Sequence, residues 1–205
     1  MSNDQSLITQ EPSRQNIRKL MRERRNSLSE NEQKLAGLHL CDQIKKFIKP
    51  NDIVALYLDN DGEVSTSPTI SYLQEHKIKT LLPVMHSFNK GYLNFQTYLS
   101  TDKTAMVKNH FDILEPKLNA QQTYSLSQID YIFMPLVAFD KQGNRLGMGG
   151  GFYDKTLSKI AELEFSPKLI GLSHDCQQVD ALPYQDWDIP LDLIITPTKI
   201  IVPDQ

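Results

Sequence analysis

The chain has 205 residues, 40% of them hydrophobic, and a formal net charge of −3; this length can bury one compact core, and the charge argues against a general nucleic-acid binder. Its two cysteines form no CxxC pair, which excludes a disulfide scaffold and a cysteine zinc site. No apolar run approaches the roughly 18 residues of a membrane span, and the polar start MSNDQSLITQEPS has no signal-peptide core. A cytoplasmic protein without membrane contact is expected.

The first part of the chain is predicted to be helical. Residues 1–12 are expected to form a disordered leader and residues 13–205 a single domain. From Ser13 onward, apolar residues recur at helical spacing and alternate with arginines. A second helix is predicted to begin at the capping-box sequence Ser29-x-x-Glu32 and to end before Pro50.

After Pro50, short apolar runs of strand length alternate with helical segments. The helices are expected from an N-cap at Ser67 to His76, with Pro68 as the first helical residue, and over residues 152–163. The expected strands are 52–58, 78–85, 92–98, 131–139, 168–172, 193–196 and an edge strand at 200–202. This alternation predicts an α/β fold with an open, mainly parallel sheet sandwiched by helices.

The segment GNRLGMGGGFYDKTL, residues 143–157, holds five of the nine glycines of the chain. It belongs to a predicted loop, 140–151, that follows the most hydrophobic strand, where open α/β sheets bind ligands. Glycines let a phosphate approach backbone N–H groups, the next helix adds its dipole, and Arg145 could add a charged bond. The loop matches neither a Walker A motif nor a full GxGxxG. A phosphate or nucleotide site is favoured, and a close-packed structural turn is the alternative.

Two carboxylates beside apolar segments are candidate magnesium ligands. Asp154 lies in the first turn of the helix after the glycines, where it either complements the dipole or binds magnesium together with substrate phosphates. Asp192 stands among apolar residues in DIPLDLIITP and therefore needs a partner.

Charged residues elsewhere leave several interpretations open. Four arginines of the first helix share one face, which is a solvated basic face, a phosphate-binding face or an RNA-binding face; the absence of interleaved aromatics disfavours RNA. They are Arg14, Arg18, Arg22 and Arg25. The acidic stretch with Asp59, Asp61 and Glu63 is either a solvated loop or a hydrogen-bond acceptor for a donor-rich heterocycle.

Together these motifs resemble the 5-formyltetrahydrofolate cyclo-ligase family. The resemblance rests on NRLGMGGGFYDKTL, on MPLVAFD before it and IGLSHDCQQVDALPYQDWDIPLDLIITP after it, and on IRKLMRERRNSLS and DGEVST nearer the start. It covers nearly the whole chain from about residue 14. It implies a fold like that of the ribose-phosphate isomerase and CoA-transferase group. It also implies that 5-formyltetrahydrofolate and ATP give 5,10-methenyltetrahydrofolate, ADP and phosphate, with Mg²⁺ required.

The resemblance also implies residue roles. The implied ATP contacts are Arg14, Arg18, Arg145, Leu146, Gly147, Met148, Gly149, Gly150, Gly151, Phe152 and Tyr153. The implied folate contacts are Leu58, Glu63, Met148, Gly149, Gly150, Gly151 and Phe152. Arg145 and Tyr153 are the expected catalytic residues, and Asp154 and Asp192 the magnesium ligands. The chain departs from the family pattern at Arg14, where lysine is usual, at Phe152, which lacks a tyrosine hydroxyl, and at Met148, where some relatives carry a basic residue.

The implied chemistry needs positioning and charge neutralisation more than a protein nucleophile. Transfer of the γ-phosphoryl group to the formyl oxygen makes that oxygen a leaving group, N10 attacks the carbon, and loss of phosphate closes the ring. The expected partners are small molecules, ATP and a folate with an unspecified number of glutamates, and a monomer is expected. Two other classes stay open: an ATP-independent phosphosugar isomerase or acyltransferase, and a non-enzymatic RNA-binding module that uses residues 14–25.

Overall fold

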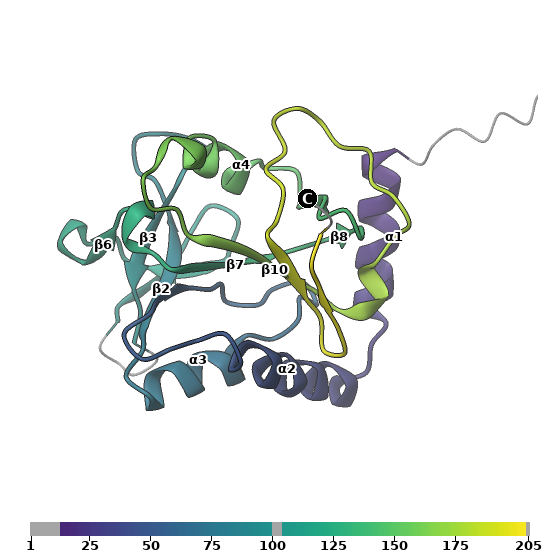
Figure 1. Cartoon of the computed structure of the whole chain (residues 1–205), viewed down its shortest axis with the longest axis horizontal. Helices are drawn as coiled ribbons and strands as arrows, with labels where there is room; N and C mark the ends of the chain where they lie inside the picture. Colours follow the sequence, from purple (N-terminus) through teal and green to yellow (C-terminus); the bar gives the residue numbers. More distant parts are fainter. Residues whose placement is uncertain (1–12, 100–103, 204–205) are drawn as a thin grey trace, which may run out of the picture.

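The computed structural model describes residues 13–99 and 104–203, so the predicted leader at 1–12 lies outside the described residues. An eight-stranded sheet crosses the molecule (Figure 1). Its strands, in spatial order, are β12 (Ile200–Ile201), β11 (Leu193–Ile195), β10 (Lys168–Leu172), β7 (Tyr131–Pro135), β1 (Ile53–Ala55), β2 (Lys79–Met85), β3 (Leu93–Thr97) and β6 (Thr123–Tyr124).

The five central strands, from β11 to β2, run parallel. The outer strands β12, β3 and β6 pair antiparallel with their neighbours. The prediction of an open, mainly parallel sheet is therefore confirmed. A separate antiparallel pair joins β4 (Met106–Lys108) to β5 (Leu114–Pro116).

Alternate residues of the central strands enter two cores, one on each face of the sheet, as the two-residue period of a strand requires. On one face, Phe133 packs with residues of α2 (Glu30–Ile44) and α3 (Ser67–Glu75). On the other, Ile132 and Met134 pack with Leu157 of α4 (Phe152–Leu157). Figure 1 shows α2 and α3 below the sheet and α4 above it. Continuous apolar runs in sequence thus correspond to strands covered on both faces.

A third cluster holds the first helix, α1 (Arg14–Asn26), against the rest of the protein. Ile17 and Met21 of α1 pack on Val137, Ala138 and Leu146. These three residues belong to the segment after β7, so the N-terminal helix lies beside the glycine-rich region. No described helix is long and apolar enough to cross a membrane.

Most helix boundaries follow the sequence signals. The capping box at Ser29 and Glu32 is present at the start of α2. For α3 the predicted cap was wrong by one residue, because Thr66 is the N-cap and Pro68 is the second helical residue. The predicted helix over 152–163 was also too long: α4 ends at Leu157, and a short 3₁₀ turn, Ile160–Glu162, follows.

The largest difference from the prediction lies between residues 136 and 146. The predicted strand 131–139 divides into β7 and β8 (Ala138–Phe139), and β8 leaves the main sheet to pair with β9 (Arg145–Leu146). Arg145 and Leu146 are consequently buried strand residues and not part of an open loop. The apolar run shows no break because both halves are buried, although in different layers.

Candidate functional site

The carboxyl ends of the parallel strands meet at one edge of the sheet, where ligand sites of open α/β folds lie. β1 ends there in the stretch Leu56–Ser65, which holds Leu58 and Glu63, and β7 ends in Leu136. β10 ends in Ser173 and His174. The N-terminal helix α1 lies beside this edge, as Figure 1 shows.

The glycine loop, Gly147–Gly151, connects β9 to α4 and is open to solvent over residues 147–150. A Cβ at Gly147 would meet no atom within 4 Å, so close packing does not explain this glycine. Gly149 and Gly151 have positive φ angles, +100° and +65°, which favour glycine. The Arg18 guanidinium lies over Gly149, and its Nε donates to the Gly147 carbonyl oxygen at 2.8 Å. The loop therefore offers bare backbone beside a cation.

Arg145 points away from this open surface. Its side chain is 6% exposed and forms an ion pair with Asp154 at 2.5 Å, and it also donates to the Ile189 carbonyl. Burial lowers the pKa of this guanidinium, while the charge of Asp154 opposes that change. In this arrangement Arg145 holds α4 and residue 189 together, and a direct bond from Arg145 to a phosphate stays a prediction.

Asp154 and Asp192 have different partners. Asp154 Oδ1 accepts from Arg145 and from the Ile189 N–H at 3.3 Å. Asp192 is exposed and precedes β11, at the amino ends of the parallel strands, and its Oδ2 accepts from the Leu169 N–H at 2.7 Å. The partner that the sequence required for Asp192 is thus a backbone amide. Among the residues that the structure describes, no group of three or more His, Cys, Asp or Glu side chains is placed to hold a metal ion.

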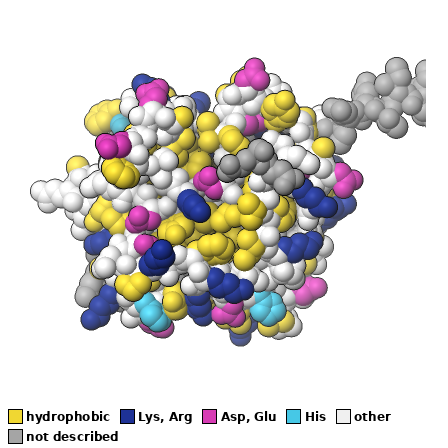
Figure 2. Space-filling model, viewed as in Figure 1, with side chains coloured by type: hydrophobic (Ala, Val, Ile, Leu, Met, Phe, Trp, Pro, Cys, Tyr) yellow, Lys and Arg dark blue, Asp and Glu magenta, His cyan; other side chains and the backbone are white. Residues whose placement is uncertain are grey.

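The arginine face of α1 is solvated only in part: the Arg22 side chain is 45% exposed, whereas that of Arg25 is 0% exposed. Arg14 forms a two-bond ion pair with Asp188 at 2.6 and 3.0 Å. Arg22 pairs with Asp61 at 2.7 Å, and Arg25 is fully buried beside the same carboxylate. The helix presents cations to three separate segments of the protein. Figure 2 shows some Lys and Arg side chains on the side of the molecule where α1 lies, and others across the centre and lower edge of the same face.

In the acidic stretch after β1, the pKa values of Asp61 and Glu63 are shifted in opposite directions. The hydrogen bond from Arg22, together with Arg25, lowers the pKa of Asp61 to about 2. Burial raises the pKa of Glu63 to about 7, although the charge of Arg25 opposes the rise. The Glu63 carboxylate accepts one hydrogen bond, from the Asn60 N–H at 3.1 Å. Glu63 is therefore a half-buried acceptor whose charge changes near neutral pH, a property typical of functional sites.

The aromatic and apolar residues of the predicted site differ in their surroundings, and of these Tyr153 interacts electrostatically with Glu63. Tyr153 packs against the core under α4, and burial, followed by the negative charge of Glu63, raises its pKa. The Phe152 ring makes an edge-on contact with Phe111, with ring centres 5.7 Å apart. Met148 is exposed, and Leu58 packs on the core that faces α2. Tyr153 and Glu63 are thus electrostatic neighbours although 90 positions separate them in the chain.

Glu63 also borders an open hollow of about 420 Å³ between the acidic stretch and α2. Its wall is lined by Gln33, Lys34, Asp59, Asn60, Asp61, Gly62, Glu63 and Ser65. A second hollow, of about 480 Å³, lies beside β3 and contains no predicted site residue.

Sequence reasoning missed two residues that organise the site. Asp188 anchors Arg14, and Arg25 joins α1 to Asp61 and to the end of β7. Arg25 was one of four arginines on a helical face, and its burial depends on tertiary contacts that helical periodicity does not report. Asp188 stands between Trp187 and Ile189 in an irregular stretch; it belongs to a segment that carries the family resemblance, but no helical or strand pattern there indicates its partner.

Comparison with known proteins supports one family. The model of the 5-formyltetrahydrofolate cyclo-ligase family matches residues 10–197. The 5-formyltetrahydrofolate cyclo-ligase of Haemophilus influenzae is 44% identical over 185 residues, which are 89% of this chain and 97% of that protein. Its Escherichia coli K12 counterpart is 39% identical, with 88% and 98% covered.

Solved structures agree with this result. The 5,10-methenyltetrahydrofolate synthetase of Aquifex aeolicus has a TM-score of 0.76 and 26% identity, with 92% of each chain covered. That of Mycoplasma pneumoniae has a TM-score of 0.70 and 25% identity, with 90% of this chain and 99% of that one covered. The chain belongs to the 5-formyltetrahydrofolate cyclo-ligase family.

Proposed function

We propose that this protein converts 5-formyltetrahydrofolate and ATP into 5,10-methenyltetrahydrofolate, ADP and phosphate. Membership of the cyclo-ligase family supports this reaction. The observation that carries it in this chain is the exposed glycine loop beside Arg18, with Glu63 as the electrostatic neighbour of Tyr153. One half of this arrangement suits phosphates, and the other half suits a heterocycle rich in hydrogen-bond donors.

The glycine loop and α1 are the proposed ATP site. The open face at Gly147 leaves room for phosphate oxygens at the backbone, and Arg18 already lies over the loop. Arg14 would contribute charge from the same helix, in exchange for its pair with Asp188. Such a site holds the γ-phosphoryl group in line with the formyl oxygen and neutralises the charge that is transferred.

Glu63 and Leu58 are the proposed pterin contacts. An ionised Glu63 accepts hydrogen bonds from ring N–H and amino groups, and the half-buried Leu58 supplies an apolar wall. Fixing the pterin ring leaves the formyl group toward the glycine loop, so that Met148–Phe152 serve both substrates. N10 then attacks the activated formyl carbon, and phosphate leaves as the ring closes.

Magnesium fits this proposal at Asp154. Both hydrogen bonds to that carboxylate use Oδ1 and come from Arg145 and Ile189, so Oδ2 is the atom that would take the ion together with ATP phosphates. The ion would neutralise phosphate charge during transfer. Asp192 stays a predicted second ligand that a variant must test, because its carboxylate holds the Leu169 amide.

A direct assay tests the proposed function. The purified protein is mixed with 5-formyltetrahydrofolate, ATP and Mg²⁺, and the near-ultraviolet absorbance of the methenyl product is followed. We expect a rise that needs both substrates. No rise with all components present would contradict the proposal, and turnover of another substrate without ATP would favour the isomerase or acyltransferase alternative.

We also propose that residues 13–205 act as one domain and as a monomer, on folates of varied glutamate number. Light scattering with size-exclusion chromatography measures the mass of the particle, and a stable dimer would contradict this part. Competition between folates with one and with several glutamates measures the preference. The expected cytoplasmic location stays a prediction.

A further inference from the structure

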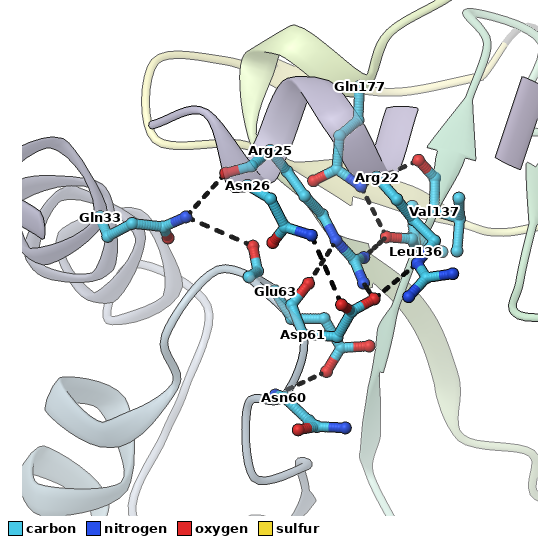
Figure 3. Close-up of polar contacts among 11 residues, drawn as sticks. Arg22, Arg25, Asn26, Gln33, Asn60, Asp61, Glu63, Leu136, Val137 and Gln177 are labelled. Atoms are coloured by element: carbon cyan, nitrogen blue, oxygen red, sulfur yellow. Dashed lines mark hydrogen bonds and ion pairs between the residues drawn. The ribbon is translucent and has the colours of Figure 1, made fainter. Parts of the chain in front are cut away.

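Arg25 is the most completely buried charged side chain of α1, with 0% of the side chain exposed. Its Nε donates to the Asp61 carbonyl oxygen at 2.8 Å, and Nη2 donates to Asp61 Oδ2 at 2.9 Å. Nη1 reaches the Leu136 carbonyl at 3.4 Å, which also accepts from Gln177. Figure 3 shows the guanidinium between Asp61 and the chain at Leu136. One side chain therefore joins α1, the stretch after β1 and the end of β7.

The turn held by this arginine has an unusual backbone. Asp61 has a φ of +51° and Gly62 a φ of +74°, and a left-handed conformation at Asp61 has to be stabilised by its surroundings. A Cβ at Gly62 would lie 2.0 Å from Asn26 Oδ1, so the turn sits directly on the end of α1. Gln33 of α2 adds a hydrogen bond to the Arg25 carbonyl at 2.9 Å. The contacts with the end of α1 fix the place of this turn.

Glu63 is the next residue in the chain, so its carboxyl group takes its position from this turn. The Asn60 N–H donates to Glu63 Oε2, and this hydrogen bond closes the stretch on itself, as Figure 3 shows. Five ionisable groups surround the carboxyl: Arg25 of α1, Asp59 and Asp61 of the same stretch, Tyr57 after β1, and Tyr153 of α4. Of these five, only Arg25 brings a positive charge.

We propose that Arg25 is the positioning residue of the folate site, which holds the Asp61–Gly62 turn so that the Glu63 carboxylate faces the pterin. This inference rests on the proposed function and on Glu63 as the pterin contact. Arg25 itself touches no substrate.

Stability alone is a weak reason for such a residue. A buried ion pair loses the hydration of both charges, and well-packed apolar residues often replace one without loss of stability. A charge beside Glu63 has a second effect, because it favours the ionised carboxylate that accepts hydrogen bonds from the pterin. Arg25 thus fixes the place of Glu63 and lowers its pKa against the larger effect of burial.

Steady-state kinetics of Arg25→Lys and Arg25→Met test the proposal. We expect kcat/KM for 5-formyltetrahydrofolate to fall by at least ten-fold in both variants, while KM for ATP stays within about two-fold. Arg24→Lys is the matched control, because Arg24 is the neighbouring arginine of the same helical turn and is exposed. It should match the wild type in both constants. Equal losses for the two substrates, or none, would overturn the proposal.

A double variant separates positioning from general damage. If Arg25 acts through Glu63, then Arg25→Lys combined with Glu63→Gln should lose no more activity than Glu63→Gln alone. Losses that multiply would show independent roles and overturn the proposal. Thermal unfolding accompanies every assay. If Arg25→Met does not fold, Arg25→Lys and Asp61→Asn carry the test, since each keeps a polar partner in the turn.

The pH dependence of kcat/KM distinguishes positioning from a purely structural role of Arg25, because a purely structural role would leave it unchanged. Removal of the positive charge in Arg25→Met should raise the pKa of Glu63 above about 7, so the acidic limb of kcat/KM for the folate moves to higher pH. Arg25→Lys keeps the charge and should leave the limb in place. An unmoved limb in Arg25→Met would overturn the proposal.

If the wild type forms no methenyl product, or if Glu63→Gln is fully active, the proposed function itself fails, and these outcomes differ from a failure confined to Arg25.

Discussion

The Glu63 carboxyl shares its surroundings with Arg25 and Tyr153, and its proton is part of the stability of the fold. Burial raises its pKa from 4.5 to about 7, so between these values the folded state binds a proton that the unfolded state has lost. The free energy of unfolding must then fall as pH rises from about 4.5 to 7 and stay level above that range. The half-buried Glu63 carboxyl therefore lowers the free energy of unfolding near neutral pH.

Glu63→Gln should remove this pH dependence. Relative to the wild type, we expect the variant to gain stability between pH 4.5 and pH 8, by no more than roughly 3 kcal/mol for a shift of this size. Denaturant unfolding at several pH values measures the difference. A difference that stays constant with pH would show that the carboxyl is not protonated near neutrality.

His174 should have the opposite effect. Its side chain is 3% exposed, and burial lowers its pKa to about 4. In the unfolded state the His174 ring therefore takes up a proton below about pH 6.5, whereas in the folded state it stays neutral down to about pH 4. The free energy of unfolding consequently falls as the pH falls through this range. We expect His174→Gln to be less sensitive to acid than the wild type in the same unfolding experiment. An identical loss in both proteins would contradict this assignment.

A magnesium titration of two variants distinguishes the roles of Asp154 and Asp192. Asn at position 154 can still accept from Arg145 and Ile189, but it removes the counter-charge of the buried Arg145 guanidinium. Asp154→Asn should therefore stay folded with a lower melting temperature, and the Mg²⁺ concentration for half-maximal turnover should rise at least ten-fold. Unchanged Mg²⁺ dependence would remove Asp154 from the metal site. A matching rise in Asp192→Asn would make Asp192 the second ligand, and a lower melting temperature alone would make it an acceptor for Leu169.

At this scale the sequence predicted residue types better than residue partners. The burial of Arg25 and the pairing of Arg14 with Asp188 join positions that are far apart in the chain, so neither helical spacing nor local composition contains them. Asp192 was expected to need a partner because its neighbours are apolar, and the structure supplies a backbone amide.

Among the elements, α1 is attached to the rest of the protein by polar contacts at both ends. Arg14 pairs with Asp188 near its start, and Arg25 is buried near its end, while Ile17 and Met21 pack between them. The helix is thus held by ion pairs at its two ends and by apolar packing in its middle. The end at Arg14 is the more exposed one, because the Arg14 side chain is 24% exposed and that of Arg25 is 0% exposed.

Asp188→Asn should loosen the start of α1 only. We expect faster amide hydrogen exchange over residues 14–18, with exchange at residues 21–26 unchanged, because the Arg25 contacts remain. Asp42→Asn is the control, since the pair of Asp42 with Lys45 lies exposed on α2. Faster exchange over the whole helix would show that the Arg14 pair anchors all of α1.

The sequence predicted elements best where local chemistry decides them. The capping box of α2 follows from two side chains three positions apart. The division of 131–139 into β7 and β8 was not predictable in this way, because Leu136, Val137 and Ala138 are buried in both arrangements and only the pairing partner changes. The length of α4 was overestimated because the apolar periodicity continues into a 3₁₀ turn.

At the scale of the whole molecule, β10 packs closely against the segments on either side of it at Gly171. A Cβ at Gly171 would lie 2.6 Å from side-chain atoms of both Leu136 and Leu191. We expect Gly171→Ala to destabilise the protein by about 1–3 kcal/mol, the usual range for an overfilled core. The midpoint of denaturant unfolding measures the loss. A midpoint equal to that of the wild type would show that these leucines move without cost.

The contact between Arg14 and Asp188 spans 174 positions of the chain, and this has a consequence for synthesis on the ribosome. α1 is made before the acidic residue that receives it, Asp188. During translation the helix carries Ile17 and Met21 without their final neighbours, and contacts between distant positions form late. Completion of the proposed ATP site is therefore expected to be among the last events in the biogenesis of the protein, after the central strands have paired.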